Sequence, residues 1–127
     1  MLNRLLVLNL ALITAHQLDA VWWREWAMFG LPGGVQLFIL LNLLLYLALL
    51  GALGPIFRRE ANGYRYSQLI AALCASVLPI HAGYALAGVS GFESAFSISL
   101  ILLCFLAAAL QAWATVRSKA QFSAAPQ

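Results

Sequence analysis

Charged side chains are scarce in this sequence. Only 9% of its 127 residues are Asp, Glu, Lys or Arg, whereas 64% are apolar. A soluble domain carries about 25% charged and about 45–50% apolar residues. A chain of this length could bury only part of so much apolar surface in a single water-facing core. The shortage of charge therefore excludes an ordinary soluble domain and predicts an integral membrane protein.

Several signatures of known chemistry are missing as well. The net charge of +3 is small and scattered, which argues against a nucleic-acid partner. The two cysteines, Cys74 and Cys104, belong to no CxxC motif, and we interpret them as small helix-packing residues. There is no HExxH motif, and Ser97 and Ser99 are followed by no base at a suitable spacing. Without these motifs the sequence does not decide whether the protein is an enzyme, and we favour the interpretation that it is not.

Long apolar runs are what the sequence does contain. A helix needs about 20 apolar residues to cross a bilayer. Four runs fit this length, at about residues 5–22, 35–53, 69–88 and 95–116. The breaks between them are rich in Gly, Pro or polar residues and lie at 30–34, 54–68 and 88–94. We predict an all-α fold, a single membrane domain over residues 1–127 that forms a four-helix bundle. We expect the polar tail at 117–127 to be disordered.

Basic residues gather on one side of these spans. The six that share this side are Arg4, Arg58, Arg59, Arg65, Arg117 and Lys119. Only Arg24 falls on the other side. Because Lys and Arg favour cytoplasmic loops, we expect both termini and the middle loop in the cytoplasm. The predicted anchors at the outer interface are Trp22, Trp23 and Trp26.

Ionisable groups collect near the outer ends of the predicted spans. At a rise of 1.5 Å per residue, His16 and His81 each lie about 20 Å from the cytoplasmic ends of their spans. Asp19 lies one turn beyond His16 on the same helical face. Such groups are costly inside a membrane and by default indicate a functional site. We predict an outward-facing site formed by His16, Asp19 and His81, with Glu25 and Glu93 near its mouth. The supporting polar residues at this level are Gln36, Tyr84 and Ser97.

The spacing of polar and small residues agrees with a cluster that faces inward. A 3-4-3-4 spacing, which makes one seam of a helix, links Asn9, Leu12, His16, Asp19 and Trp23. Steps of seven residues in the fourth span link Ser97, Cys104 and Gln111. Small and weakly polar residues let membrane helices approach and hydrogen-bond. We therefore expect His16 to face His81 across the outer half of the bundle.

Four interpretations fit this cluster. Two imidazoles with a carboxylate can ligate Zn²⁺ or nonhaem iron and leave positions open for another ligand. Two opposed histidines could instead hold a haem, although Asp19 suits its apolar wall poorly. The same groups could relay protons in a carrier or channel built as a homo-oligomer. They could also be an ordinary hydrogen-bonded set in an accessory or assembly subunit of a larger membrane complex. We favour a site for a metal ion or small polar ligand.

One segment, HQLDAVWWREWAMFGLPGGVQLF, carries many of these residues. Its distinctive positions are His16, Asp19, Trp23, Glu25, Trp26, Pro32 and Gly33. On these residues, the stretch from His16 to about Asn42 resembles an uncharacterised family of small bacterial four-span membrane proteins, a domain of unknown function. The resemblance implies a multi-pass protein of a bacterial inner membrane and assigns no activity.

Overall fold

The computed structural model describes residues 1–123 and contains helices but no strand in that range. The helices are α1 (Leu2–Trp22), α2 (Glu25–Met28), α3 (Gly34–Phe57), α4 (Ala61–Leu86), α5 (Ala95–Arg117) and α6 (Lys119–Ser123). Of these, α1, α3, α4 and α5 are long and apolar enough to cross a membrane. The predicted all-α, multi-pass membrane fold is confirmed.

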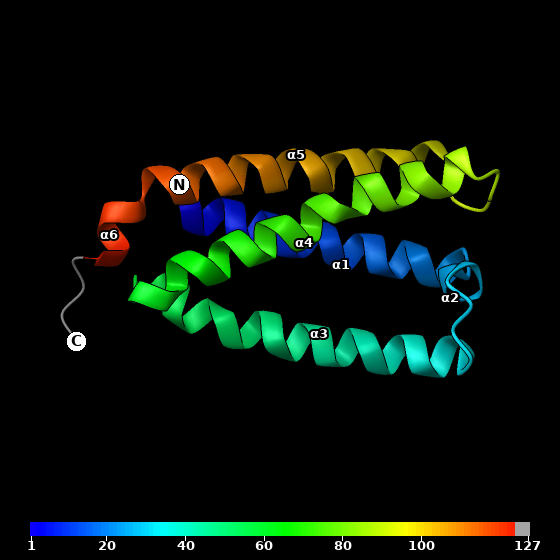
Figure 1. Ribbon diagram of the computed structural model, residues 1–127, viewed down its shortest axis with the longest axis horizontal. Helices are drawn as coiled ribbons and strands as arrows, with labels where there is room; N and C mark the ends of the chain where they lie inside the picture. The colour runs from blue at the N-terminus through cyan, green and yellow to red at the C-terminus, as the bar shows by residue number, and fades with distance from the viewer. Residues whose placement is uncertain (124–127) are drawn as a thin grey trace.

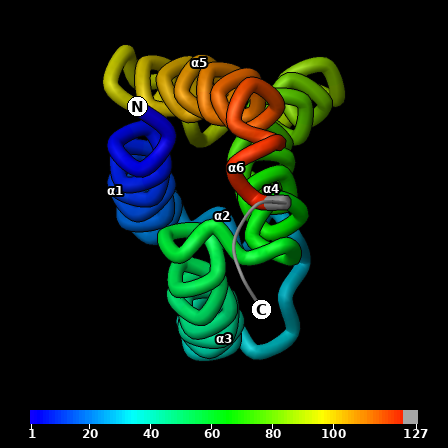
Figure 2. The backbone as a smooth tube through the Cα atoms, turned by 90° about the vertical axis from the view of Figure 1, so that its left-hand side faces the viewer, coloured from blue at the N-terminus to red at the C-terminus, as the bar shows by residue number. Residues whose placement is uncertain are grey.

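The four long helices run side by side along the length of the molecule (Figure 1). In the end-on view, α1 and α4 lie on either side below α5, and α3 lies farthest from α5 (Figure 2). Only Phe38, Leu49 and Ile56 are buried on α3, whereas α5 buries nine residues. The bundle is therefore asymmetric, with a tight core of α1, α4 and α5 and with α3 along one side.

Small residues explain the tight core. On α5, Cys104, Ala107 and Ala108 are buried at helical spacing, which lets neighbouring helices approach closely. Gln111 ties three helices together, because its Oε1 accepts from Nδ2 of Asn9 at 2.9 Å and its Nε2 donates to the carbonyl of Ser67 at 3.0 Å. By contrast, α3 leaves a long row of leucines exposed, which suits a surface covered by lipid.

The turn between α3 and α4 is shorter than the sequence indicated. The expected break covered residues 54–68, but α3 continues to Phe57 and α4 begins at Ala61. The first turn of α4 lies so close to the end of α3 that a Cβ on Gly63 would collide with the backbone of Pro55. The polar residues after position 60 thus lie in the first turns of α4, outside its apolar span, and do not belong to the turn between the helices.

The polar tail also differs from expectation. Instead of being disordered from residue 117, the chain forms α6, and Phe122 on this helix is only 2% exposed. The ring of Phe122 packs edge-on against Tyr64 at 6.1 Å, and the guanidinium of Arg59 lies 5.1 Å from its centroid. One aromatic side chain therefore anchors this segment. The remainder of the predicted tail, residues 124–127, lies outside the described residues.

Candidate metal centre

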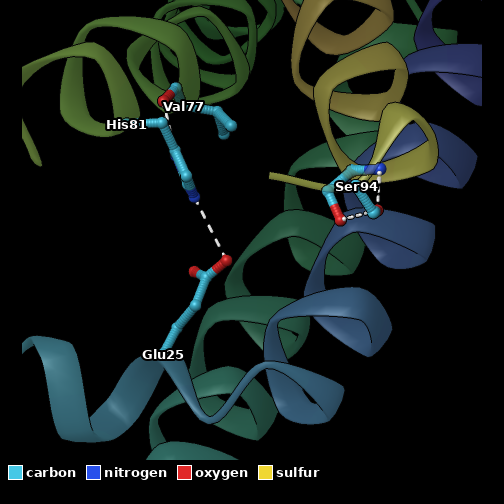
Figure 3. Close-up of polar contacts among 5 residues, drawn as sticks. Glu25, Val77, His81 and Ser94 are labelled. Atoms are coloured by element: carbon cyan, nitrogen blue, oxygen red, sulfur yellow. Dashed lines mark hydrogen bonds and ion pairs between the residues drawn. The ribbon is translucent and has the colours of Figure 1, made fainter. Parts of the chain in front are cut away.

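A tight reversal of the chain after α1 creates the site. Arg24 has a φ of 58°, in the left-handed region that non-glycine residues adopt uncommonly. This turn starts α2 in a new direction, and Glu25, its first residue, is only 2% exposed. Figure 3 shows the Glu25 side chain extending from α2 toward His81 on α4. The distance from Oε1 of Glu25 to Nε2 of His81 is 3.1 Å.

His81 is held by its other ring nitrogen. Nδ1 lies 2.8 Å from the carbonyl oxygen of Val77, one turn earlier on α4 (Figure 3). A carbonyl only accepts hydrogen bonds, so Nδ1 carries a proton and donates it. In the neutral ring, the lone pair of Nε2 then faces the carboxylate of Glu25. Two acceptors cannot bond to each other, so the pair must share one proton or another cation.

His16 completes the cluster from α1. It is 3% exposed, and its ring lies edge-on to that of His81 with centroids 5.0 Å apart. Its Nδ1 is buried and has no hydrogen-bond partner among the described residues. One ligand atom each from His16, Glu25 and His81 lies within 4.8 Å of the others. Phe92 packs edge-on against His81 at 4.8 Å and covers the cluster from the loop between α4 and α5.

This donor set suits a divalent transition metal. Zinc with two histidines, one glutamate and an open fourth position is a common catalytic arrangement, and the same donors hold nonhaem Fe²⁺. Metal–ligand distances of about 2.0–2.2 Å place tetrahedral ligand atoms about 3.4 Å apart. Oε1 of Glu25 and Nε2 of His81 are already 3.1 Å apart, so mainly His16 would have to move closer. The carbonyl of Val77 supplies the outer hydrogen bond that fixes a ligating imidazole. Glu25 fills the space in front of Nε2 of His81, which disfavours a haem there.

The carboxylates occupy different places from those predicted. Glu25, expected at the mouth, lies inside the cluster because α2 folds it back between the helices. Asp19 is half-buried one turn beyond His16 and does not belong to the group of three, although its Oδ2 is buried and has no partner among residues 1–123. Glu93 is exposed and lies apart from the group.

The supporting polar residues have other roles. Gln36 is exposed, and the half-buried ring of Tyr84 packs edge-on against Phe29 at 5.5 Å. Ser97 is buried, and its backbone N–H donates to Oγ of Ser94 at 3.0 Å. The side chain of Ser94 thereby caps the first turn of α5 (Figure 3).

The tryptophans differ in exposure. Trp22 is 79% exposed at the end of α1, as an interfacial anchor would be. Trp23 and Trp26 are half-buried, and the ring of Trp26 lies 6.1 Å from that of Phe38. These two rings therefore also help to pack the end of the bundle around α2.

A cavity borders the cluster, and sequence reasoning missed it. Its volume is about 320 Å³, it lies between α1, α3 and α4, and His16 and Glu25 are part of its wall. Asn42 of α3 also lines it. The Nδ2 of Asn42 donates to the carbonyl of Phe38 at 2.9 Å, whereas its Oδ1 is buried without a partner among the described residues. The polar Asn42 within a leucine run was the available signal.

Comparison with known proteins identifies the family. The chain belongs to the family of unknown function DUF6713, whose model matches residues 2–118. No match is found among curated proteins or among solved structures. Membership agrees with the predicted resemblance to an uncharacterised family, and it brings no activity with it.

Proposed function

We propose that this membrane protein binds one divalent transition-metal ion, Zn²⁺ or Fe²⁺, through His16, Glu25 and His81. The observation that carries the proposal is the convergence of two imidazoles and one carboxylate, at most 5% exposed, within 4.8 Å of one another. Three ionisable groups from three separate helices are costly in an apolar bundle unless they compensate one another or a ligand.

The hydrogen bonds around His81 support this assignment. Its Nδ1 donates to Val77, which leaves Nε2 as the nitrogen that can ligate. A metal ion at this position would replace the proton that Nε2 and Glu25 share. An ion ligated through Nδ1 of His16 would also give this buried, unpaired atom a partner.

The proposal places the metal in the outer half of a bacterial inner membrane. Both the N-terminus and α6 lie at the end of the bundle opposite α2 (Figure 1). Six of the seven basic residues flank spans on the side of the termini, which favours the cytoplasm for that side. The cluster beside α2 then faces the outer leaflet.

The second candidate is an accessory subunit without a metal. The observation that favours it is that both ring nitrogens of His81 already have partners within the protein. In that case the Glu25–His81 pair would be a structural hydrogen bond that orients α2 on α4. It would leave the buried Nδ1 of His16 without a role.

Metal analysis of purified protein separates the two candidates. We expect one Zn²⁺ or Fe²⁺ per chain in the unaltered protein and loss of the metal in His16→Ala, His81→Ala and Glu25→Gln. Glu93→Gln is the matched control, because it removes an exposed carboxylate near the same end of the bundle. Circular dichroism checks that each variant remains folded. A folded protein that takes up no metal at micromolar concentration contradicts the proposal and supports the accessory subunit.

A further inference from the structure

The cavity beside the cluster is elongated along the helices. Its lining on α3 runs from Phe38 to Leu45, and its lining on α4 runs from Leu73 to Ile80. Each stretch covers seven residue steps, which is about 10 Å at the rise of an α-helix. An apolar cavity of about 150 Å³ holds one benzene, so a volume of about 320 Å³ has room for about a dozen non-hydrogen atoms. The space therefore has the volume of a short single chain, and a chain of about ten carbons fits its length when it is bent.

The polarity of the lining changes along this length. His16 and Glu25 lie at the end near α2, where Phe29, Leu31 and Phe38 also form part of the wall. Asn42 and Ser76 lie farther along it. At the other end the wall is formed by leucines, including Leu45 and Leu73. A molecule with one polar end and an apolar chain matches this gradient, with its polar end beside the histidines.

The unpaired atoms indicate which polar group fits. The Oδ1 of Asn42 is buried and lacks a donor among the described residues, so the ligand should donate a hydrogen bond. A divalent ion at the cluster would be ligated by the carboxylate of Glu25 and would face the buried Oδ2 of Asp19, which lies one turn beyond His16 and has no partner among residues 1–123. With these two charges balancing the ion, the ligand should also be neutral. A hydroxyl group meets both conditions, whereas a carboxylate would add an unbalanced charge to an apolar cavity.

We infer that the cavity between α1, α3 and α4 binds a single-chain alcohol of about ten carbons, with its hydroxyl near Asn42 and the His/Glu cluster. This inference rests on the proposed function, because the bound ion sets the charge balance and offers an open position to the hydroxyl oxygen. Since Phe92 covers the cluster from the loop side, the cavity is also the route by which such a molecule would reach it.

Photolabelling in proteoliposomes tests the ligand. The probe is 1-decanol with a diazirine at mid-chain, and the labelled residues are located by mass spectrometry. We expect labels on cavity residues of α3 and α4. At equal membrane concentrations, unlabelled 1-decanol should compete at least about tenfold better than decanoate, because burying an uncompensated charge is costly. Decane should compete about fivefold less well than decanol, the equivalent of one lost hydrogen bond.

Two variants localise the effect, each with a matched control. Asn42→Leu removes the acceptor at similar volume and should weaken labelling about fivefold, whereas Asn62→Leu, at an exposed position of α4, should not. Ser76→Phe fills the cavity and should abolish labelling there, whereas Ser99→Phe, on the exposed face of α5, should leave it unchanged.

Metal content measured on the same samples keeps the two proposals apart. Metal-loaded protein with labels only on lipid-facing residues, or with equal competition by decanol, decanoate and decane, overturns the ligand assignment and leaves the metal site standing. Metal-free protein overturns the proposed function. In that event, labelling that keeps its preference for decanol and its loss in Ser76→Phe supports the cavity as the binding site and overturns the contact of the hydroxyl with an ion, and absent labelling overturns both.

Discussion

Replacing Glu25 with glutamine should have opposite effects with and without metal. In metal-free protein, the amide introduced by Glu25→Gln carries no charge and can donate to the lone pair of Nε2 on His81. The variant thus keeps the hydrogen bond and loses the cost of a buried carboxylate, so its unfolding free energy should equal or exceed that of the unaltered protein. With metal bound, the unaltered protein should have the larger unfolding free energy, because an amide is a poor metal ligand.

The size of the reversal follows from binding linkage. A metal at about 100 times its dissociation constant stabilises the folded protein by about 2.7 kcal/mol, and this stabilisation should be absent in Glu25→Gln. Glu25→Ala is the contrasting variant, because it leaves Nε2 of His81 unpaired and should cost about 1–3 kcal/mol even without metal.

Thermal unfolding in detergent, with added Zn²⁺ and with a chelator, measures both effects. Two results would refute this reasoning. An equal shift with metal in the unaltered protein and in Glu25→Gln would show that the ion binds elsewhere. A loss of stability in chelator that is as large for Glu25→Gln as for Glu25→Ala would show that the carboxylate charge itself holds the fold.

Three further predictions concern the proton and the packing. Metal binding should release about one proton from the Glu25–His81 pair, seen as a buffer-dependent binding enthalpy in calorimetry, and a buffer-independent enthalpy would contradict the shared proton. Gln111→Leu should lower the unfolding free energy by about 1–3 kcal/mol, because it leaves Nδ2 of Asn9 unpaired, whereas the exposed Gln36→Leu should change it by less than about 0.5 kcal/mol. Gly63→Ala should lower the unfolding free energy by about 1–3 kcal/mol, because the added Cβ collides with the backbone of Pro55. Gly83→Ala has open space around its Cβ and should be neutral or stabilising. Equal effects of the two substitutions would contradict this packing.

The regular rise of helices made part of the site predictable. His16 and His81 were placed at one depth by counting residues from the ends of two spans, and their rings lie 5.0 Å apart. The seam through Asn9 and the seven-residue steps to Gln111 likewise indicated two helix faces that are now joined by a hydrogen bond of 2.9 Å. Periodicity carries such information because each residue adds a fixed rotation and translation.

The carboxylate of the site was not predictable in the same way. Asp19 was the expected partner because it shares a helical face with His16, but Glu25 reaches the cluster through a backbone reversal at Arg24. A left-handed arginine has no reliable sequence signal. The position of α3 was harder to predict, since in a nearly uniform leucine run only isolated polar residues such as Asn42 indicate which side meets its neighbours.

The two polar groups inside this bundle differ in a way that bears on function. Ser67, Gln111 and Thr115 lie in the tight α1–α4–α5 core and hydrogen-bond to one another or across helices, as groups that specify packing do. The cluster at the other end lies where α3 stands away from α1 beside a cavity, and there His16 and Asn42 each bury an atom without a partner among the described residues. The core also holds one such atom, Oδ1 of Asn9, so the contrast is one of degree. A ligand in the cavity would supply partners to Nδ1 of His16 and Oδ1 of Asn42, because both residues line it.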